Sequence, residues 1–215
     1  MAGAIGGYRT ARFTPMAKRA MDIAIAATAL LLAAPFFLVV SLMVRMDGGP
    51  AFYAHPRVGR FGTIFGCLKF RSMVVDSQAR LEALLAADPA ARAEWDATRK
   101  LKNDPRITRI GHFLRATSLD ELPQLINVLR GEMAIVGPRP VTLTELDQYY
   151  GAAAAHYLTV RPGITGLWQV SGRSETSYDQ RVALDVAYVS QPSLLADMRI
   201  LLKTPVAVLS RRGAH

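Results

Sequence analysis

Residues 117–123 contain two adjacent carboxylates, Asp120 and Glu121, in a setting that could support chemistry. Ser118 and Glu121 have the spacing of a helix capping box, but Pro123 fits that register poorly, so Asp120 could be the N-cap instead. Either register places both carboxylates at a helix N-terminus, which favours ionised groups and can attract a phosphate. A carboxylate held there beside a phosphorylated substrate and a divalent cation could act as a nucleophile. A structural helix cap is the alternative.

Three single basic residues could neutralise phosphate oxygens, namely Lys69, Arg71 and Arg115, although isolated cations are often solvated surface groups. No G-x-x-x-x-G-K-[ST] pattern occurs, so the sequence does not support a P-loop. The histidines are too scattered to indicate a metal cage; they are His55, His112, His156 and His215.

Two segments combine basic residues with a restricted or glycine-rich backbone. In residues 137–140, Pro138 and Pro140 restrict the chain on either side of Arg139, so a rigid guanidinium could bind phosphate. Residues 161–173 are basic, glycine-rich and contain a tryptophan, which could contact a nucleotide. Their candidate ligands are Arg161, Gln169 and Arg173. An ordinary turn or loop is the alternative in both places.

Residues 23–44 form a run of 22 residues without a charge, which is long enough for a membrane helix. Pro35 lies within it and should break or kink a helix, leaving arms of roughly 18 Å and 14 Å in a hydrocarbon layer about 30 Å thick. Basic residues flank both ends, so the positive-inside rule exports neither. A re-entrant hairpin and a kinked single-pass helix both fit, whereas a cleaved signal peptide does not.

The length of 215 residues suits one catalytic domain with an anchor. We divide the chain into a basic segment at 1–22, a membrane helix-break-helix at 23–44 and a cytosolic catalytic domain at 45–215. The net charge of +9 requires an anionic partner, such as anionic lipid, a phosphorylated substrate or nucleic acid. Cys67 is the only cysteine, which excludes an intramolecular disulfide and fits a reducing cytosol.

Alternating apolar and polar residues predict an α+β fold with short strands, one of them at 68–73. Residues 76–100 are rich in Ala, Leu, Glu and Arg, which predicts a solvated helical insertion interrupted at Asp88–Pro89. Asp104–Pro105 has the form of an N-cap followed by proline, so a short amphipathic helix should begin there and end near Arg115.

These motifs resemble the monotopic bacterial phosphoglycosyl transferases, the sugar transferases that start exopolysaccharide, O-antigen and glycoprotein glycan synthesis. The resemblance runs from Lys18-Arg19-Ala20-Met21-Asp22 to the C-terminus. Its most specific parts are residues 118–125, 131–140, 161–173 and 185–189.

The resemblance implies that Asp120 attacks the β-phosphate of a UDP-sugar, releases UMP and passes the phosphosugar to undecaprenyl phosphate. It implies that Glu121 is the adjacent acid and that Mg²⁺ bridges the carboxylates and the diphosphate. It also favours a re-entrant helix broken at Ala34–Pro35, interfacial amphipathic helices, and a place on the cytoplasmic face of the bacterial inner membrane. Familiar members often carry Ser before this proline, whereas Ala34 offers no hydroxyl to satisfy the freed backbone groups.

The insertion at 76–100 is longer than in the smallest members of this family and resembles that of the hexose-phosphate transferases, and this resemblance favours glucose or galactose over a diacetamido sugar. A different class of function is a non-catalytic, membrane-bound adaptor of polysaccharide assembly, which would release no UMP from a UDP-sugar. The apolar anchor and the lack of an aromatic-basic platform argue against nucleic acid as a partner. Membrane lipid is an expected partner. The sequence does not decide whether the protein forms a homodimer.

Overall fold

The computed structural model describes residues 15–98, 101–172 and 176–209. The chain begins with the long helix α1 (Pro15–Arg45), followed by the strands β1 (Phe52–Val58) and β2 (Ile64–Phe70) on either side of the turn η1 (Arg60–Gly62). Next come the helices α2 (Ser77–Ala87), α3 (Pro89–Thr98) and α4 (Arg109–Thr117), the turn η2 (Leu119–Glu121) and the helix α5 (Gln124–Arg130).

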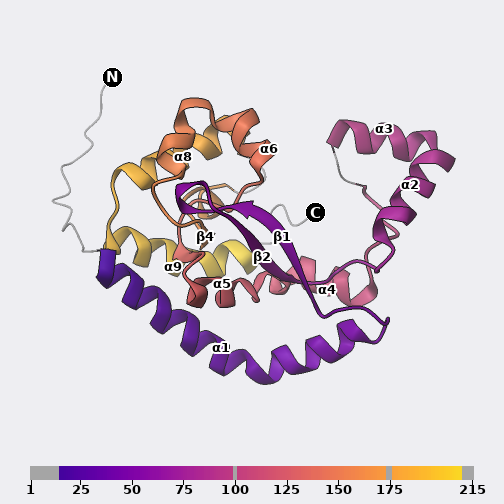
Figure 1. Cartoon of the computed structure of the whole chain (residues 1–215), viewed down its shortest axis with the longest axis horizontal. Coiled ribbons are helices and arrows are strands. Elements are labelled where there is room, and N and C mark those ends of the chain that lie inside the picture. Colours follow the sequence, from indigo (N-terminus) through magenta and orange to yellow (C-terminus); the bar gives the residue numbers. More distant parts are fainter. Residues whose placement is uncertain (1–14, 99–100, 173–175, 210–215) are drawn as a thin grey trace.

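The second half alternates short elements and ends in two longer helices (Figure 1). These elements are β3 (Ala134–Val136), α6 (Leu143–Glu145), η3 (Leu146–Tyr150), η4 (Gly151–Ala153), α7 (Ala154–Tyr157), β4 (Gly163–Thr165), η5 (Trp168–Val170), α8 (Tyr178–Ser190) and α9 (Leu194–Leu209). Helices mixed with a few short strands confirm the coarse α+β prediction.

The described strands form two separate pairs. β1 and β2 are antiparallel, with Phe52 opposite Phe70, whereas β3 and β4 are parallel. At the parallel pair, a Cβ atom on Gly163 would lie 2.1 Å from the Gly137 nitrogen, so only glycine permits this approach. The strand predicted at 68–73 ends earlier, at Phe70. Beyond it, Met73 forms only an isolated bridge with Ile107.

α1 is one continuous helix of 31 residues that passes through Pro35, and it follows a curved path along one side of the domain (Figure 1). The predicted interruption at Ala34–Pro35 is therefore wrong as a helix boundary, since a curved helix can accommodate a proline on its exposed side. The helix also begins before residue 23, at Pro15; residues 1–14 lie outside the described residues.

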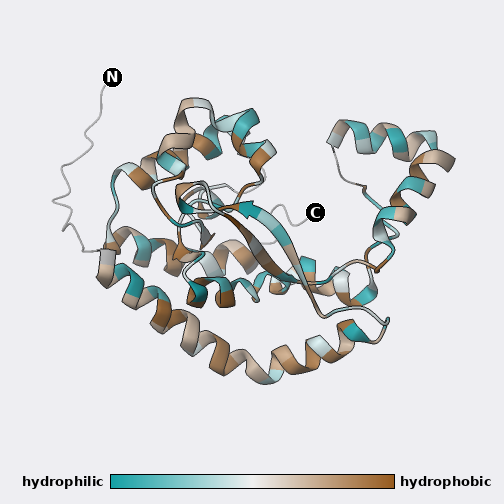
Figure 2. Ribbon diagram, viewed as in Figure 1, coloured by the Kyte–Doolittle hydropathy of each residue, from teal (hydrophilic) through white to brown (hydrophobic). Residues whose placement is uncertain are grey.

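Both arms of α1 pack against the domain. Ala26, in the first arm, joins the main hydrophobic core, which includes Cys67 and Val136. In the second arm, Val40 and Val44 pack with Phe70 and Leu114 in another cluster. The outward side is strongly apolar (Figure 2) and exposes large side chains, including Leu31, Leu32, Leu38, Val39 and Leu42.

A buried polar network holds the first turns of α1. Asp22 is 2% exposed, and its Oδ1 accepts a hydrogen bond of 3.1 Å from the Ile135 N–H of β3. Lys18 Nζ lies 3.4 Å from Asp22 Oδ1 and 2.8 Å from Asp197 Oδ2 of α9. The Tyr188 hydroxyl of α8 donates to Asp197 Oδ1 at 2.8 Å, so the network joins four elements.

The other end of α1 is held by Arg71. Its Nη2 donates to the Val44 carbonyl at 2.8 Å and also pairs with Asp47, which follows the helix. Its Nε donates to the Pro50 carbonyl at 2.7 Å. Both ends of α1 are therefore hydrogen-bonded to the same domain.

The helical insertion predicted at 76–100 is confirmed as α2 and α3, which meet at Asp88–Pro89. Asp88 Oδ1 accepts from the Ala90 and Ala91 N–H groups at 2.8 Å and 3.2 Å, which caps α3. Leu81 is the only buried residue within the two helices as described, and the pair projects away from the body (Figure 1).

The helix predicted to start at Asp104–Pro105 starts later, at Arg109. Thr108 is its N-cap, because the Thr108 Oγ1 accepts a 3.0 Å hydrogen bond from the Gly111 N–H. Asp104 instead forms a two-pronged ion pair with Arg106, at 2.8 Å and 2.7 Å. This charge-assisted pair competes with helix capping for the same carboxylate.

The stability of the β2–α5 contact should depend on Asn127, which is 0% exposed. Its Oδ1 accepts from the Leu68 N–H at 2.9 Å, and its Nδ2 donates to the Gly66 carbonyl at 2.8 Å and to Glu132 at 2.6 Å. Asn127→Ala leaves these groups without a buried partner. We expect the free energy of unfolding to fall by roughly 3 kcal/mol.

For a chain of this size, that loss lowers the melting temperature by about 6–12 °C, measurable in detergent by circular dichroism. Asn103→Ala, at an exposed position, is the matched control and should melt like the wild type. Equal melting temperatures for the two variants would contradict the assigned role of Asn127.

Candidate active site

Ser118 directs the two carboxylates into the domain. It ends α4 in the left-handed conformation, with φ of 57°, and its N–H donates to the Arg115 carbonyl at 3.2 Å. The turn η2 then carries Asp120 and Glu121 toward α5. Ser118 is the N-cap residue of η2, but its side chain makes no cap hydrogen bond, so the predicted capping box is wrong. Asp120 is not an N-cap, because it lies within η2 and α5 follows Pro123. Both carboxylates do lie in the first turn of a helical segment, as either register predicts.

The cation Lys69, from β2, lies beside both carboxylates. Its Nζ is 2.7 Å from Glu121 Oε1 and 3.6 Å from Asp120 Oδ2. Arg139 approaches from the loop after β3, and its Nη2 donates to Glu121 Oε1 at 2.9 Å. Side chains from three separate parts of the chain therefore meet at this site.

The surroundings shift the pKa values of the two adjacent carboxyl groups in opposite directions. Asp120 is 9% exposed; its burial raises the pKa of its carboxyl, the Lys69 charge opposes that rise, and the Glu121 charge adds to it. Burial also acts to raise the pKa of Glu121, but Arg139 and Lys69 together outweigh it and lower this pKa to about 2. Glu121 is thus the permanently ionised member, whereas Asp120 holds its charge less firmly.

Arg115 borders the site at the end of α4. Its Nε donates to Ser72 Oγ at 2.9 Å, and burial lowers the pKa of the guanidinium, against the opposing charge of Asp120. The guanidinium is thus partly desolvated, but Arg115 keeps exposed surface, so it can still present N–H groups to a phosphate. This arrangement fits its predicted place beside the carboxylates.

The loop that holds Arg139 is packed against the domain. Pro138 and Pro140 are buried, and the Pro138 carbonyl accepts from the Gly163 N–H at 2.7 Å. Gln169 is fixed by its Nε2, which donates to the Ile164 carbonyl at 3.0 Å, while its Oε1 is buried with no hydrogen-bond partner. Gln169 therefore keeps a buried acceptor next to the β3–β4 pair.

Arg71, predicted to bind phosphate, and Arg161, predicted to contact a nucleotide, both make hydrogen bonds within the protein. Arg71 is buried, and all five of its N–H donors are directed at Asp47 or at backbone carbonyls, which leaves none for a phosphate. Arg161 donates from Nε to the Gly131 carbonyl at 2.6 Å, at the end of α5, where Arg19 binds neighbouring carbonyls. Arg173 lies outside the described residues.

The sequence reasoning used Arg57 only as a flanking charge and missed its place near the site. Arg57 faces the same side of the β1–β2 pair as Lys69, because Arg57 is opposite Phe65 and Lys69 is opposite Tyr53. Its Nη1 forms a 2.9 Å ion pair with Glu145. The signal that could have found it is strand alternation, which becomes usable only once the register is known.

The donor chemistry of the site fits Mg²⁺. Within the described residues, no group of three or more His, Cys, Asp and Glu side chains could hold a metal. Asp120 and Glu121 supply two carboxylates, and Mg²⁺ typically combines one or two carboxylates with water and substrate phosphates. The position of the Lys69 ammonium near both carboxylates marks a place where positive charge is stabilised.

Comparison of the sequence with known proteins identifies the family of this chain. The profile of the family described as "Bacterial sugar transferase" matches residues 13–211. Because the match covers nearly the whole chain, the protein belongs to the bacterial sugar transferase family. The sequence-based assignment to the sugar transferases is thus confirmed.

Three relatives are especially similar. The "UDP-galactose-lipid carrier transferase" of Erwinia amylovora is 56% identical over 92% of this chain and 41% of its own length. The "Undecaprenyl-phosphate galactose phosphotransferase" of Salmonella typhimurium is 53% identical over 96% of this chain and 43% of its own. The "Exopolysaccharide production protein ExoY" of Rhizobium meliloti is 52% identical over 93% of this chain and 88% of its own length. The chain thus spans about two fifths of the first two relatives and most of the third.

Replacing Glu121 with glutamine should lower the pKa of Asp120. The change removes a like charge, and it leaves Lys69 and Arg139 free to act on Asp120 alone. We expect the wild-type Asp120 pKa to lie above the ordinary value of 3.8, and the variant to ionise at a lower pH. ¹³C NMR titration of the carboxyl carbons in metal-free buffer measures both values, with Asp120→Asn identifying the resonance.

The matched control is Glu82→Gln on the exposed helix α2, which should leave the Asp120 titration unchanged. An Asp120 pKa that stays constant or rises in Glu121→Gln would contradict the described coupling of the two carboxylates.

Proposed function

We propose that this chain transfers a sugar-1-phosphate from a UDP-sugar to undecaprenyl phosphate at a membrane surface, and so initiates polysaccharide or glycoconjugate synthesis. The observation that carries the proposal is the buried carboxylate Asp120, placed next to an ionised Glu121 and near Lys69. The names of the Erwinia and Salmonella relatives support the same reaction class.

The proposed reaction has two displacements at one phosphorus atom. A carboxylate oxygen of Asp120 attacks the β-phosphorus of the UDP-sugar, and the bond to the bridging oxygen breaks, releasing UMP with that electron pair. A phosphate oxygen of undecaprenyl phosphate then attacks the same phosphorus, and the Asp120 carboxylate leaves. The product is an undecaprenyl diphosphate sugar, and the enzyme returns to its starting state.

The cations around Asp120 bind the substrate phosphates in this scheme. Arg115 and Arg139 would neutralise phosphate oxygens, since guanidinium groups match their geometry. Pro138 and Pro140 would hold Arg139 in place, and Gln169 could offer its unpaired Oε1 to a donor on the substrate. Raising the pKa of Asp120 by burial also makes its carboxylate more nucleophilic than a solvated one.

Mg²⁺ is the proposed cofactor, held by Asp120 and Glu121. When bound, it would supply positive charge to the diphosphate. Glu121 suits this role because its depressed pKa keeps it ionised across the physiological range.

The sugar is proposed to be a hexose, with galactose ahead of glucose. Two relatives above 50% identity are named for the transfer of galactose. A panel of UDP-sugars assayed with undecaprenyl phosphate would identify the donor directly.

The proposed topology is monotopic, with α1 dipping into the cytoplasmic leaflet of the inner membrane. Within the described residues, Met16–Arg45 is the one helix long and apolar enough to cross a membrane. Its first turns are tied to α9 and β3 through Lys18 and Asp22, and its last turn is tied to Arg71. A helix with both ends bound to one domain is difficult to reconcile with a single pass.

Other helices would lie at the interface. α9 exposes an apolar stripe, which includes Leu202 and Val206, and α4 exposes Phe113. No observation favours the alternative of a non-catalytic adaptor. That nucleic acid is not a partner stays a prediction from the sequence. The homodimer stays an open alternative.

Asp120→Asn should abolish sugar-phosphate transfer and leave the fold intact, because an amide keeps the shape of the side chain but is a poor nucleophile. We expect release of UMP from UDP-galactose to fall at least 1,000-fold, an order of magnitude set by the loss of a nucleophile. The measurement is UMP formation by purified protein with undecaprenyl phosphate and Mg²⁺, alongside a melting curve.

Asp76→Asn, at an exposed position before α2, makes the same chemical change and should retain full activity. Substantial turnover by correctly folded Asp120→Asn protein would remove Asp120 from the nucleophile role.

Cysteines introduced at Met16 and Met46, one at each end of α1, should both face the cytoplasm. Both positions are highly exposed, at 81% and 85%. In intact spheroplasts a membrane-impermeant maleimide should label neither site, and after permeabilisation it should label both. The native chain is the control, since Cys67 is buried and burial raises its thiol pKa to about 11. Labelling of only one site in intact spheroplasts would establish a spanning helix.

A further inference from the structure

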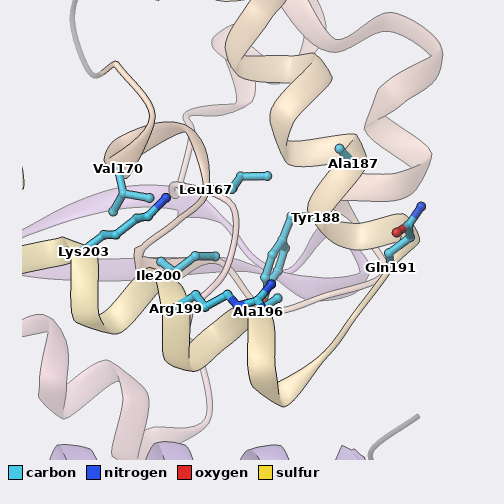
Figure 3. Close-up of a pocket in the computed structure, with 9 residues that line it drawn as sticks. All are labelled: Leu167, Val170, Ala187, Tyr188, Gln191, Ala196, Arg199, Ile200 and Lys203. Carbon is cyan, nitrogen blue, oxygen red and sulfur yellow. The ribbon is translucent and has the colours of Figure 1, made fainter. Parts of the chain in front are cut away.

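A pocket of about 370 Å³ opens between α8, α9 and the turn η5, and it shares no lining residue with the site around Asp120 (Figure 3). Its volume lies within the range of small-ligand sites. Five of the nine lining residues are aliphatic, and the other four carry a polar group. The lining residues are Leu167, Val170, Ala187, Tyr188, Gln191, Ala196, Arg199, Ile200 and Lys203.

The two cations of the pocket come from one face of α9. Arg199 and Lys203 are four residues apart, so they are neighbours on the helix surface. Figure 3 shows Lys203 extending toward Val170 and Arg199 extending toward Tyr188, with Ile200 between them. A ligand in this pocket would therefore meet an apolar floor and two positive charges.

An exposed apolar stripe runs along α9 directly beside these cations. It consists of Leu195, Met198, Leu202 and Val206, which are 45–74% exposed. With 3.6 residues per turn, Arg199 and Lys203 fall between this stripe and the pocket residues Ala196 and Ile200. Asp197, on the opposite side, is buried against the domain.

The apolar stripe followed by the two cations matches the layers of a bilayer surface, where the apolar acyl region is followed by the charged phosphate groups. Apolar residues of an interfacial helix enter the acyl region, and flanking Lys and Arg side chains reach the phosphate level. The net charge of +9 adds a long-range attraction to anionic headgroups. The exposed apolar side of α1 provides a second surface of the same kind.

We propose that this pocket binds one anionic phospholipid of the surrounding bilayer. Arg199 and Lys203 contact the phosphate, the headgroup beyond it enters the pocket beside Tyr188 and Gln191, and the acyl chains lie along the exposed apolar stripe of α9 toward the bilayer. A bilayer lipid is favoured over the undecaprenyl acceptor because an acceptor phosphate must reach Asp120, which is not part of this pocket. The inference rests on the proposed membrane association and does not depend on the transfer reaction.

The bound lipid would hold α8 and α9 together at the membrane. Tyr188 lines the pocket and also donates to Asp197, which pairs with Lys18 of α1. Occupancy of the pocket would therefore stabilise the junction between the membrane helix and the domain, and should raise the melting temperature.

The test is a titration of the full chain in maltoside micelles with dioctanoyl phosphatidylglycerol. Native mass spectrometry measures the bound lipid, and a melting curve is recorded in parallel. We expect one tightly bound lipid per chain. Dioctanoyl phosphatidylcholine and inorganic phosphate should bind at least tenfold more weakly.

Arg199→Gln/Lys203→Gln should weaken phosphatidylglycerol binding at least tenfold. The matched control is Arg80→Gln/Arg92→Gln on α2 and α3, which removes the same charge from exposed positions and should bind like the wild type. Ala187→Phe is an independent variant that narrows the pocket and keeps both cations, and it should also lose the lipid. Its melting curve without lipid shows whether the domain is folded.

Three outcomes would overturn the proposal. Phosphatidylcholine carries the same phosphate beside a quaternary ammonium, so its equal binding would show that the net negative charge of the lipid is not recognised. Equal binding of inorganic phosphate would show a simple anion site. Displacement by undecaprenyl phosphate, with a raised acceptor KM in the double variant, would assign the pocket to the acceptor. UMP release is measured in every variant, so failure of the transferase assignment is detected separately.

Discussion

The buried pairing of Lys18 with Asp22 and Asp197 is the contact on which the arrangement of the chain depends. Charges in an interior are tolerated when they are paired and hydrogen-bonded, and loss of one partner is strongly destabilising. Because Asp22 also accepts from the Ile135 N–H of β3, the apolar helix is fixed relative to the strand that leads to Arg139. The positions of α1 and of the loop that carries Arg139 are thus set by the same few hydrogen bonds.

The candidate site follows a related principle, in which neighbouring groups of like charge are made different by their surroundings. Lys69 and Arg139 keep Glu121 ionised, and burial acts against the charge of Asp120. Two adjacent residues can then take separate roles, one as a stable anion and one as a reactive carboxylate. The left-handed Ser118 matters here, because it ends α4 and turns both side chains inward.

The pairing of Lys69 and Arg139 with Glu121 is visible only in the structure. The sequence predicted the two helices that precede and follow Asp88–Pro89, and it singled out the carboxylates and the basic residues separately, because composition, proline placement and residue type carry those signals locally. It did not separate Lys69 from Arg71. Both residues fit one alternating pattern, but β2 ends between them at Phe70, and Arg71 turns toward the end of α1. The start of α4 was misplaced for a similar reason, since Asp104 is taken by Arg106. Tertiary contacts decide both cases.

The projecting pair α2 and α3 touches the body through few side chains, among them Trp95, whose ring lies 5.1 Å from the Arg106 guanidinium. Neither helix supplies a residue to the hydrophobic clusters that surround α1. This arm is consequently a natural grafting point. A fluorescent protein, an affinity handle or a tether to another enzyme could be inserted at Asp88–Pro89, and the exposed apolar side of α1 would stay clear of the cargo.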